Sequence, residues 1–225
     1  MFDRTEILIG KDNLKKLNNS NILVVGVGGV GGYVCEFLVR AGIENLTIID
    51  FDTVDITNKN RQIIALDSTL HSTKVDVLSD RLRDINKNLK LSVFDKKLDN
   101  NLLLSLNLRQ YDYIVDAIDD VANKVLLIKK CYENNIPCIS AMGAGNRFDI
   151  PNFIVSDIFK TSHDGLAKIL RKRLRGENVL NHKVVYSKSL PVKIDGVIGS
   201  ISYYPPACAS VLTAYVVNEL LNIKG

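Results

Sequence analysis

The chain of 225 residues is 46% hydrophobic and 24% charged, and its formal net charge is +4. These values are those of an ordinary globular protein with enough residues for one good-sized core. No apolar run reaches the roughly 18 to 20 residues of a membrane-spanning helix, and the N-terminal segment carries no signal-peptide pattern. We therefore expect a cytoplasmic protein, and so small a net charge does not by itself indicate binding to nucleic acid.

The four cysteines exclude two kinds of stabilised scaffold. Cys35, Cys131, Cys138 and Cys208 are scattered along the chain and form no C-x-x-C pair. That pattern argues against a structural zinc site and against a disulfide framework, so no zinc is expected. Cys35 and Cys131 have apolar neighbours and are expected to be buried thiols. The segment around Cys208 leaves a reactive thiol open, although it shows no activating base.

The first two thirds of the chain alternate predicted strands and helices. An amphipathic lead-in is expected over residues 5–17. Short apolar runs predict buried strands over 22–25, 46–49, 91–94, 113–115 and 136–139. Helical patterns lie between them, over 30–40, over 73–86 with Ser72 as the N-cap, and over 121–133. This alternation predicts an α/β fold with a doubly wound, mainly parallel, Rossmann-like sheet and right-handed crossovers.

The rhythm changes after about residue 150. We expect an irregular strand, a basic helix, hairpin-like strands over 183–190 and 197–204, and a last helix over 207–221. Our interpretation is a single domain over residues 1–225. Residues 1–150 would form its nucleotide-binding α/β core, and residues 151–225 an α+β elaboration at the C-terminus.

A glycine-rich turn follows the first predicted strand. Gly26, Gly28 and Gly31 satisfy G-x-G-x-x-G, and Asp50 closes the next apolar run as a ribose-binding carboxylate would. The glycines only allow a tight turn and a close approach of a helix N-terminus to negative charge. That geometry suits a triphosphate as well as the pyrophosphate of NAD, so the turn alone does not identify the nucleotide.

Polar residues are dense beyond Asp50, at the carboxyl end of the second strand. They are Asp52, Asp55, Asn58, Asn60, Arg61 and Gln62, with Lys74 opening the next helix. Ligands of open α/β sheets bind at this edge, and an arginine offers a bidentate fork for phosphate oxygens. A nicotinamide-dependent dehydrogenase needs little after its ribose-binding acid, so this set favours a nucleotide triphosphate.

A second acidic group ends the strand predicted over 113–115. Asp116, Asp119 and Asp120 face the glycine loop across the expected sheet edge. One or two carboxylates with the phosphates of a nucleotide are a typical magnesium site. One of these aspartates is also expected to cap the helix that begins near Val121, and we assign the metal to Asp119.

These pieces occur together as "GVGGVGG", "DFDTVDITNKNRQ", Lys74 and "DAIDD". The set resembles the ubiquitin-activating-like adenylating family (ThiF, MoeB and HesA). The resemblance implies attack of a carboxylate on the α-phosphorus of ATP, giving an acyl-adenylate and pyrophosphate. Such a step needs positioning and charge neutralisation more than acid–base groups, which agrees with the lack of an obvious catalytic His or Cys.

Within that family, nearly the whole chain resembles the tRNA threonylcarbamoyladenosine dehydratase branch. The matching segments are "FDRTEILIG", "NKNRQIIAL", "VDAIDDVANKVLLIKKC", "DIFKTSHDGLAKILRKRLR" and "GSISYYPPACASVLTAYVVNELL". The paired C-x-x-C of the sulfur-carrier activators is absent. The resemblance implies that ATP and Mg²⁺ activate the threonylcarbamoyl carboxylate on the tRNA adenosine beside the anticodon. That group would then close to a cyclic oxazolone with net loss of one water.

The resemblance also assigns roles to single residues. The phosphate loop would be shaped by Gly26, Gly28, Gly29 and Gly31. The other ATP-binding residues would be Asp50, which holds the ribose, and Asp52, Asn58, Arg61, Gln62 and Lys74. Arg61 and Lys74 would also stabilise the transition state, and Asp119 would hold Mg²⁺. Arg4 would reach the ATP of the partner subunit in a homodimer.

The basic helix predicted near residue 170 gains a purpose from the same resemblance. Lys168, Arg171, Lys172, Arg173 and Arg175 would neutralise tRNA phosphates. Leu166, Ile169, Leu170 and Leu174 would form its apolar stripe. The alternative is a helix whose charged face is merely solvated.

Other functions stay open at this point. The chain could adenylate the C-terminal carboxylate of a ubiquitin-like sulfur carrier, act as an NAD-dependent oxidoreductase, or serve as a non-catalytic nucleotide-binding scaffold. A monovalent cation, K⁺ or Na⁺, in the segment "AMGAGNRF" and a sulfur-transfer accessory protein are also open.

Overall fold

A seven-stranded sheet forms the centre of the computed structural model, which describes residues 1–223. The strands are β1 (Asn21–Val25), β2 (Asn45–Asp50), β3 (Lys90–Asp95), β4 (Tyr113–Asp116), β5 (Cys138–Ala141), β6 (Phe153–Asp157) and β7 (Lys183–Ser187). The helices are α1 (Asp3–Ile9), α2 (Lys11–Asn19), α3 (Gly31–Ala41), α4 (Lys74–Ile85), α5 (Asn100–Ser105), α6 (Val121–Glu133), α7 (Gly165–Gly176) and α8 (Tyr204–Leu221). The order of strands across the sheet is β3-β2-β1-β4-β5-β7-β6.

The sheet is parallel except at one edge. Strands β3, β2, β1, β4, β5 and β7 pair in parallel, and β6 pairs antiparallel to β7. The order reverses beside β1, because the chain first builds outward to β3 and then returns to add β4 on the other side. This reversal confirms the doubly wound α/β fold, and it is the point at which such sheets bind ligands.

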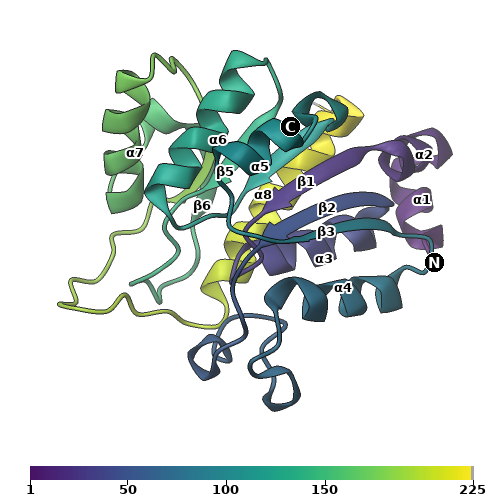
Figure 1. Cartoon of the computed structure of the whole chain (residues 1–225), viewed down its shortest axis with the longest axis horizontal. Helices are drawn as coiled ribbons and strands as arrows, with labels where there is room; N and C mark the ends of the chain where they lie inside the picture. Colours follow the sequence, from purple (N-terminus) through teal and green to yellow (C-terminus); the bar gives the residue numbers. More distant parts are fainter. Residues whose placement is uncertain (224–225) are drawn as a thin grey trace.

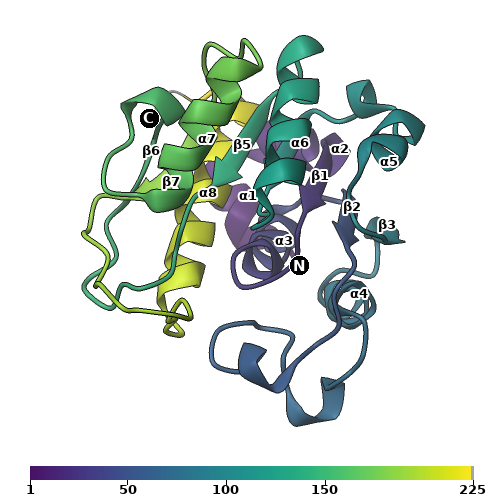
Figure 2. The same ribbon diagram turned by 60° about the vertical axis from the view of Figure 1, so that its left-hand side comes forward.

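Helices cover both faces of the sheet (Figures 1 and 2). Alternate residues of β1 point to opposite sides, because Ile22 and Val24 belong to one buried cluster and Leu23 and Val25 to another. The first cluster also contains side chains of α3, α4 and α8, and the second contains side chains of α5 and α6. A third cluster joins α6 to α7. After Asn21, the residues of β1 are therefore all apolar, as expected of a strand that is buried on both faces.

One predicted strand in the C-terminal region is absent, and the predicted pairing of its neighbour is wrong. No strand forms over 197–204: residues 188–203 are irregular, and α8 already begins at Tyr204. The antiparallel partner of β7 is instead β6, which precedes it in the chain with α7 between them. Val197 and Ile198 are exposed to 88% and 72%, so their apolar character does not reflect burial in the core.

Smaller differences concern element ends. The lead-in is two helices, α1 and α2, separated at Gly10, whose positive φ of 84° interrupts the helical path. Thr73, not Ser72, is the N-cap of α4, and its hydroxyl lies 2.5 Å from the Asp76 carboxylate. Strand β5 begins at Cys138, two residues later than Ile136. Within residues 1–223, no helix has the length and apolar character needed to cross a membrane.

Candidate active site

A cavity of about 920 Å³ opens at the carboxyl ends of the central strands. Its walls come from the loops that follow β1, β2, β4 and β5, together with the start of α4 and residues near 200. The predicted residues that line it are Gly26, Gly28, Gly29, Asp50, Asp52, Asn58, Arg61, Gln62, Lys74 and Asp119. Segments far apart in the sequence thus meet at the edge that the strand pattern indicated.

The glycine loop needs glycine at two positions for different reasons. Gly26 has a φ of +85°, and a Cβ on it would lie 2.7 Å from the carbonyl oxygen of Ala117. A Cβ on Gly31 would lie only 1.8 Å from the carbonyl oxygen of Gly26. Gly31 does not line the cavity, and its contribution is close packing of α3 against the loop.

The carboxylate of Asp50 holds the glycine loop against the end of β2. One oxygen accepts a hydrogen bond from the backbone N–H of Val27 at 2.7 Å, and the other accepts from Asp52 at 2.9 Å. A carboxylate has about four acceptor positions, so two remain for hydroxyl donors such as those of a ribose. Asp50 is therefore oriented before any ligand arrives.

A short 3₁₀ helix, Ile56–Asn58, presents the polar residues that follow β2. Asp55 and Asn58 cap each other's backbone, which fixes the turn. Arg61 donates from one terminal nitrogen to the Thr57 carbonyl at 2.8 Å and to the side chain of Asn60 at 2.9 Å. An arginine has five donors, so others remain for an anion in the cavity. The Oε1 atom of Gln62 is buried and has no hydrogen-bond partner among residues 1–223.

Lys74 is buried at the start of α4 and lies across the cavity wall. Its Nζ is 2.7 Å from an oxygen of Asp52, a carboxylate that is half exposed. A positive group at a helix N-terminus is opposed by the helix dipole, and Asp52 offsets that cost here. This pair also fixes the position of the lysine ammonium at the cavity wall.

The two aspartates after β4 have different surroundings. Asp120 is the N-cap of α6 and accepts from the backbone N–H of Asn123 at 2.8 Å. Asp119 is exposed, lines the cavity and has no hydrogen bond or ion pair within the described residues. Capping by one of the pair, which the sequence predicted, is confirmed for Asp120. The carboxylate of Asp119 is the one left available to a ligand.

A chain of buried polar groups, Lys124, Asp116, Ser140 and His182, lies beneath the cavity. Lys124 Nζ and Asp116 Oδ2 are 2.9 Å apart and both side chains are fully buried. Ser140 Oγ is 2.5 Å from Asp116 Oδ2 and 2.7 Å from His182 Nε2. Strands β4 and β5 are thus joined to the residue that precedes β7, below the loop that carries Asp119.

This polar chain also fixes the residue before Asp119. Lys124 Nζ donates to the carbonyl of Ile118 at 2.8 Å. The other Asp116 oxygen accepts from the N–H of Ile118 at 3.1 Å. Sequence reasoning missed Lys124, because a lysine in a helical pattern is ordinarily solvated. It also gave no role to His182, whose imidazole is buried.

The buried imidazole makes stability depend on pH. Burial, helped by the positive charge of Lys124, lowers the pKa of His182 from 6.5 to about 3. The folded protein therefore keeps His182 neutral while the unfolded chain takes up a proton below pH 6.5. We expect the free energy of unfolding to fall as the pH drops from about 6.5 towards 3, by up to about 1.4 kcal/mol per pH unit from this group.

Urea unfolding at pH 7, 6, 5 and 4 measures this effect. His182→Gln is expected to flatten the dependence between pH 6 and 4, although it lowers stability at pH 7. His71→Asn is a suitable control, since His71 is exposed and has a φ of 68° that asparagine tolerates. An unchanged pH slope in His182→Gln would show that this imidazole is not the group responsible.

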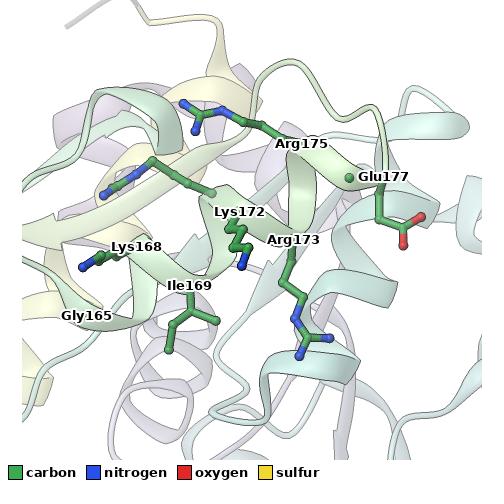
Figure 3. Close-up of a pocket in the computed structure, with 9 residues that line it drawn as sticks. Gly165, Lys168, Ile169, Lys172, Arg173, Arg175 and Glu177 are labelled. Atoms are coloured by element: carbon green, nitrogen blue, oxygen red, sulfur yellow. The ribbon is translucent and has the colours of Figure 1, made fainter.

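The basic helix α7 forms the rim of a second hollow (Figure 3). Its basic side chains are Lys168, Arg171, Lys172, Arg173 and Arg175, and all five line that hollow. Arg171 is half-buried and donates to the Thr161 carbonyl at 3.1 Å, and the Arg175 guanidinium lies 5.2 Å from the centre of the Phe159 ring. Lys168, Lys172 and Arg173 are exposed and have no such partner within residues 1–223. These three are the most accessible to a polyanion.

The buried stripe of α7 differs in part from the prediction. Ala167, Leu170 and Leu174 are buried, whereas Ile169 is 49% exposed and Leu166 is only partly buried. The stripe follows spacings of three and four residues from Ala167, and Ile169 lies outside it. Ile169 instead lies among the basic side chains at the hollow (Figure 3).

All four cysteines are buried free thiols. Burial raises the pKa of Cys208 to about 12, so this residue is not a reactive thiolate at neutral pH. The expectation of buried thiols at Cys35 and Cys131 is confirmed. Among residues 1–223, no group of three or more His, Cys, Asp and Glu side chains is arranged to hold a metal ion.

One predicted residue lies outside the cavity, and two lysines that were not predicted line it. Arg4 is exposed on α1 and is not among the residues that line the cavity. Lys96 and Lys97 do line it, and the Nζ of Lys97 lies 5.5 Å from the centre of the exposed Phe51 ring. Both lysines follow the end of β3, so the rule that found the other residues could have indicated them too.

The fold and the cavity together define a nucleotide-binding protein of the doubly wound α/β class, with a glycine loop, an oriented carboxylate and four cationic side chains. The chain belongs to the ThiF family, whose model matches residues 2–174. Membership of this family favours the adenylating interpretation over a nicotinamide-dependent oxidoreductase.

Two relatives and one crystal structure show which enzymes this chain resembles. The tRNA threonylcarbamoyladenosine dehydratase of Bacillus subtilis is 40% identical over 197 residues, which are 86% of this chain and 76% of that protein. The crystal structure of E. coli tRNA N6-threonylcarbamoyladenosine dehydratase, TcdA, in complex with ATP matches with a TM-score of 0.91 and 32% identity. That match covers 98% of this chain and 93% of TcdA. The E. coli molybdopterin-synthase adenylyltransferase is 31% identical over 202 residues, which are 89% of this chain and 77% of that protein.

Proposed function

We propose that this protein is an ATP-dependent tRNA threonylcarbamoyladenosine dehydratase. The observation that carries the proposal is the convergence of Asp50, Arg61, Lys74 and Asp119 on one cavity at the sheet's reversal point. The identity to the dehydratase of Bacillus subtilis and the likeness to the ATP complex of TcdA support it. The chain would act as one adenylating domain, with residues 151–225 extending the nucleotide-binding core.

In the first step, an oxygen of the threonylcarbamoyl carboxylate attacks the α-phosphorus of ATP and pyrophosphate leaves. Negative charge grows on the oxygens of the α- and β-phosphates. Arg61 has donors free for it, and the Lys74 ammonium is held along the same wall by Asp52. In the second step, the ureido oxygen attacks the activated carboxyl carbon, AMP leaves and a ureido proton is lost. The substrate thus supplies its own nucleophile.

Asp119 fits a magnesium ion, because its carboxylate lines the cavity without a protein partner among residues 1–223. Mg²⁺ usually binds through one or two carboxylates together with substrate phosphates and water, so the lack of a larger acidic cluster agrees with this role. When bound, Mg²⁺ neutralises charge on the departing pyrophosphate. Asp119 would hold the ion, and Asp50 would hold the ribose.

The functional unit would be a homodimer, in which Arg4 of each chain reaches the site of its partner. Support comes from α1, where Ile7 and Leu8 are exposed to 85% and 83% beside Arg4. We further propose a cytoplasmic location, which a tRNA substrate would favour, and a sulfur-transfer protein as a candidate accessory partner.

Mass analysis of tRNA nucleosides tests the proposed function. The protein is incubated with ATP, Mg²⁺ and tRNA that carries threonylcarbamoyladenosine, and the tRNA is digested under mild conditions that spare the cyclic product. We expect an ATP-dependent loss of one water from that nucleoside, and Lys74→Ala serves as the inactive control. An unchanged nucleoside, with ATP binding demonstrated, would contradict the proposal. Pyrophosphate exchange that depends on a ubiquitin-like carrier would then support the sulfur-carrier alternative.

Neutralising the accessible side chains of α7 tests the tRNA surface. The triple variant of Lys168, Lys172 and Arg173 to alanine is expected to bind tRNA more weakly. The slope of log affinity against log salt should become shallower by about 2, because each lost phosphate contact removes roughly 0.7 to 0.9. Fluorescence anisotropy with labelled tRNA between 50 and 200 mM salt (about the range in which such slopes are measured) records both quantities.

A second triple variant controls for net charge. Arg83, Lys87 and Lys90 are exposed between the end of α4 and the start of β3, near the other edge of the sheet. Their change to alanine removes the same number of positive charges. We expect this control to leave most of the affinity and the slope intact. Equal losses in both triple variants would mean that tRNA responds to overall charge and not to α7.

A further inference from the structure

The segment after β5 forms one wall of the cavity and depends on a single arginine. Residues 141–145 line the cavity directly. The side chain of Arg147, two residues beyond them, is only 3% exposed. An arginine buried to this extent is rare unless its charge is paired and its donors are bonded, so its partners define what it does.

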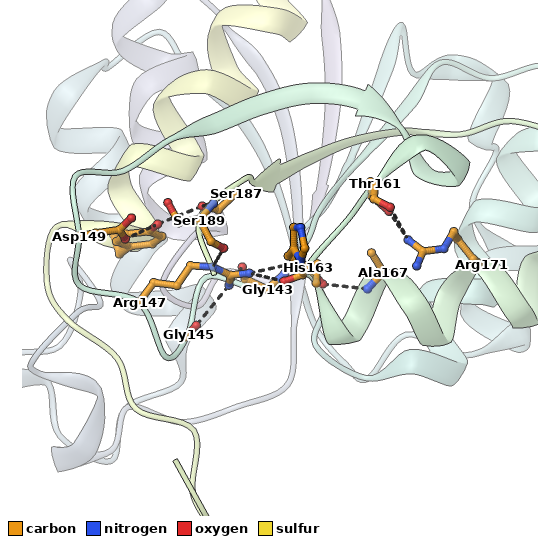
Figure 4. A network of polar contacts seen from close by, with 12 residues as sticks. Gly143, Gly145, Arg147, Asp149, Thr161, His163, Ala167, Arg171, Ser187 and Ser189 are labelled. Atoms are coloured by element: carbon orange, nitrogen blue, oxygen red, sulfur yellow. Dashed lines mark hydrogen bonds and ion pairs between the residues drawn. The ribbon is translucent and has the colours of Figure 1, made fainter. Parts of the chain in front are cut away.

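The guanidinium of Arg147 is surrounded by backbone carbonyl oxygens (Figure 4). It donates to the carbonyl of Gly143 at 2.9 Å and to that of Gly145 at 3.3 Å. It also donates to the carbonyl of Ser189 at 3.0 Å and to that of His163 at 3.1 Å. Three segments that are distant in the sequence therefore share one positive charge: the cavity wall, the residues before α7, and the start of the loop over 188–203.

A buried carboxylate completes this arrangement. An Asp164 oxygen lies 3.8 Å from the Arg147 guanidinium and accepts from the backbone N–H of Gly143 at 3.1 Å. The other oxygen accepts from Ala167 at 2.8 Å and so caps α7. The orientation of the cavity wall and the start of the basic helix are thus set by the same pair of charges.

Several carbonyl oxygens and one carboxylate around a single positive centre are also the ligands that a bound K⁺ or Na⁺ would need. Carbonyl dipoles that point at one another repel unless a cation lies between them. In this chain the Arg147 guanidinium supplies that cation and already takes the carbonyl oxygens of Gly143 and Gly145 in the segment "AMGAGNRF". A monovalent metal ion does not fit there.

We propose that Arg147 is a positioning residue that replaces a monovalent cation, so that the cavity keeps its shape without K⁺ or Na⁺. The inference concerns the geometry of the cavity wall and does not require the dehydratase reaction. The melting temperature tests directly whether the cavity wall depends on a monovalent metal ion. ATP affinity, the second readout, rests on the proposed function.

The first experiment uses the unaltered protein in tetramethylammonium, sodium and potassium chloride at equal ionic strength. We expect the same melting temperature and an ATP dissociation constant within about twofold in all three salts. A twofold change is small beside the tenfold change that about 1.4 kcal/mol would cause. A selective stabilisation by K⁺ or Na⁺ would overturn the proposal. If ATP fails to bind in every salt, the proposed function fails, while the melting temperatures still test Arg147.

The second experiment removes the guanidinium. Arg147→Ala is expected to melt about 10 °C lower in tetramethylammonium chloride, because Asp164 and four carbonyls lose their partner. Millimolar guanidinium or added K⁺ should recover part of that loss and part of the ATP affinity. Arg83→Ala, which alters an exposed arginine of α4, should show neither the loss nor the recovery.

Recovery by an added cation separates positioning by charge from ordinary packing. If Arg147→Ala folds but responds to no cation, its charge is not what holds the wall, and the proposal is wrong. If Arg147→Ala does not fold, Arg147→Lys keeps the charge but cannot reach all four carbonyls with one ammonium. Arg147→Lys should fold with a lower melting temperature, and added guanidinium should raise that temperature. No response of Arg147→Lys to guanidinium would equally count against the proposal.

Discussion

Replacing Lys74 by alanine is expected to lower the turnover number by about 100- to 1000-fold and to change ATP affinity far less. The ammonium is buried beside the cavity and is held in place by Asp52 at 2.7 Å, so it needs no rearrangement when charge develops on the phosphates. Loss of one such preorganised donor typically costs about 2.7–4 kcal/mol of transition-state stabilisation. Single-turnover kinetics and equilibrium ATP binding separate the two effects.

Arg61→Ala should behave in the same way, because its remaining donors are placed towards the same cavity. Lys59→Ala is the matched control: Lys59 lies two residues away and pairs with the exposed Asp67 outside the cavity lining. We expect near-normal turnover in this control. Unchanged turnover in both Lys74→Ala and Arg61→Ala would remove the adenylation mechanism described above.

The second large effect concerns stability. Lys124→Met is expected to lower the free energy of unfolding by about 3–5 kcal/mol, because it leaves the carboxylate of Asp116 buried without its cation. Urea unfolding at pH 7 measures the loss. The double variant Lys124→Met with Asp116→Asn should recover much of it, since an uncharged amide is far less costly to bury than a lone carboxylate.

Lys129→Met provides the control on the same helix. Lys129 is on α6 and pairs at 2.6 Å with Glu177, and both side chains are partly exposed. A surface pair of this kind contributes little, so we expect the stability of Lys129→Met to stay close to that of the unaltered protein. A small loss in Lys124→Met, similar to that of the control, would mean that water or a rearranged Asp116 compensates for the missing lysine.

Most strands and helices of the first 150 residues were predictable because they have a local signature, whereas the short helix α5 (Asn100–Ser105) was not predicted. The helix over 121–133 was predicted with its observed ends, since Asp120 caps it and the apolar period is regular. The positions of Asp50 and Asp119 followed as well. In a parallel sheet the carboxyl ends of neighbouring strands lie at one edge, so residues that follow separate strands must meet there.

The missed features depend on contacts that leave no local signal. Asp116 and His182 are 66 positions apart, and only the pairing of β5 with β7 brings Ser140 between them. The apolar residues near 197 have the pattern of a strand, yet isolated hydrogen bonds to Asn146 hold their segment in place of a strand ladder. The backbone N–H of Gly199, for example, donates to the Asn146 side chain at 2.6 Å. Arg147 had no predicted role, because nothing in its neighbourhood indicated hydrogen bonds to the distant carbonyls of His163 and Ser189.

The burial of every cysteine has a practical consequence for work on this protein. A thiol reagent can reach Cys35, Cys131, Cys138 or Cys208 only when the chain opens, so its rate of reaction follows local or global opening of the fold. A cysteine introduced at an exposed position, such as Lys172 on α7, would react first and could carry a fluorophore without removal of the native thiols. Distance changes between such a label and a labelled nucleic acid could then be followed in real time.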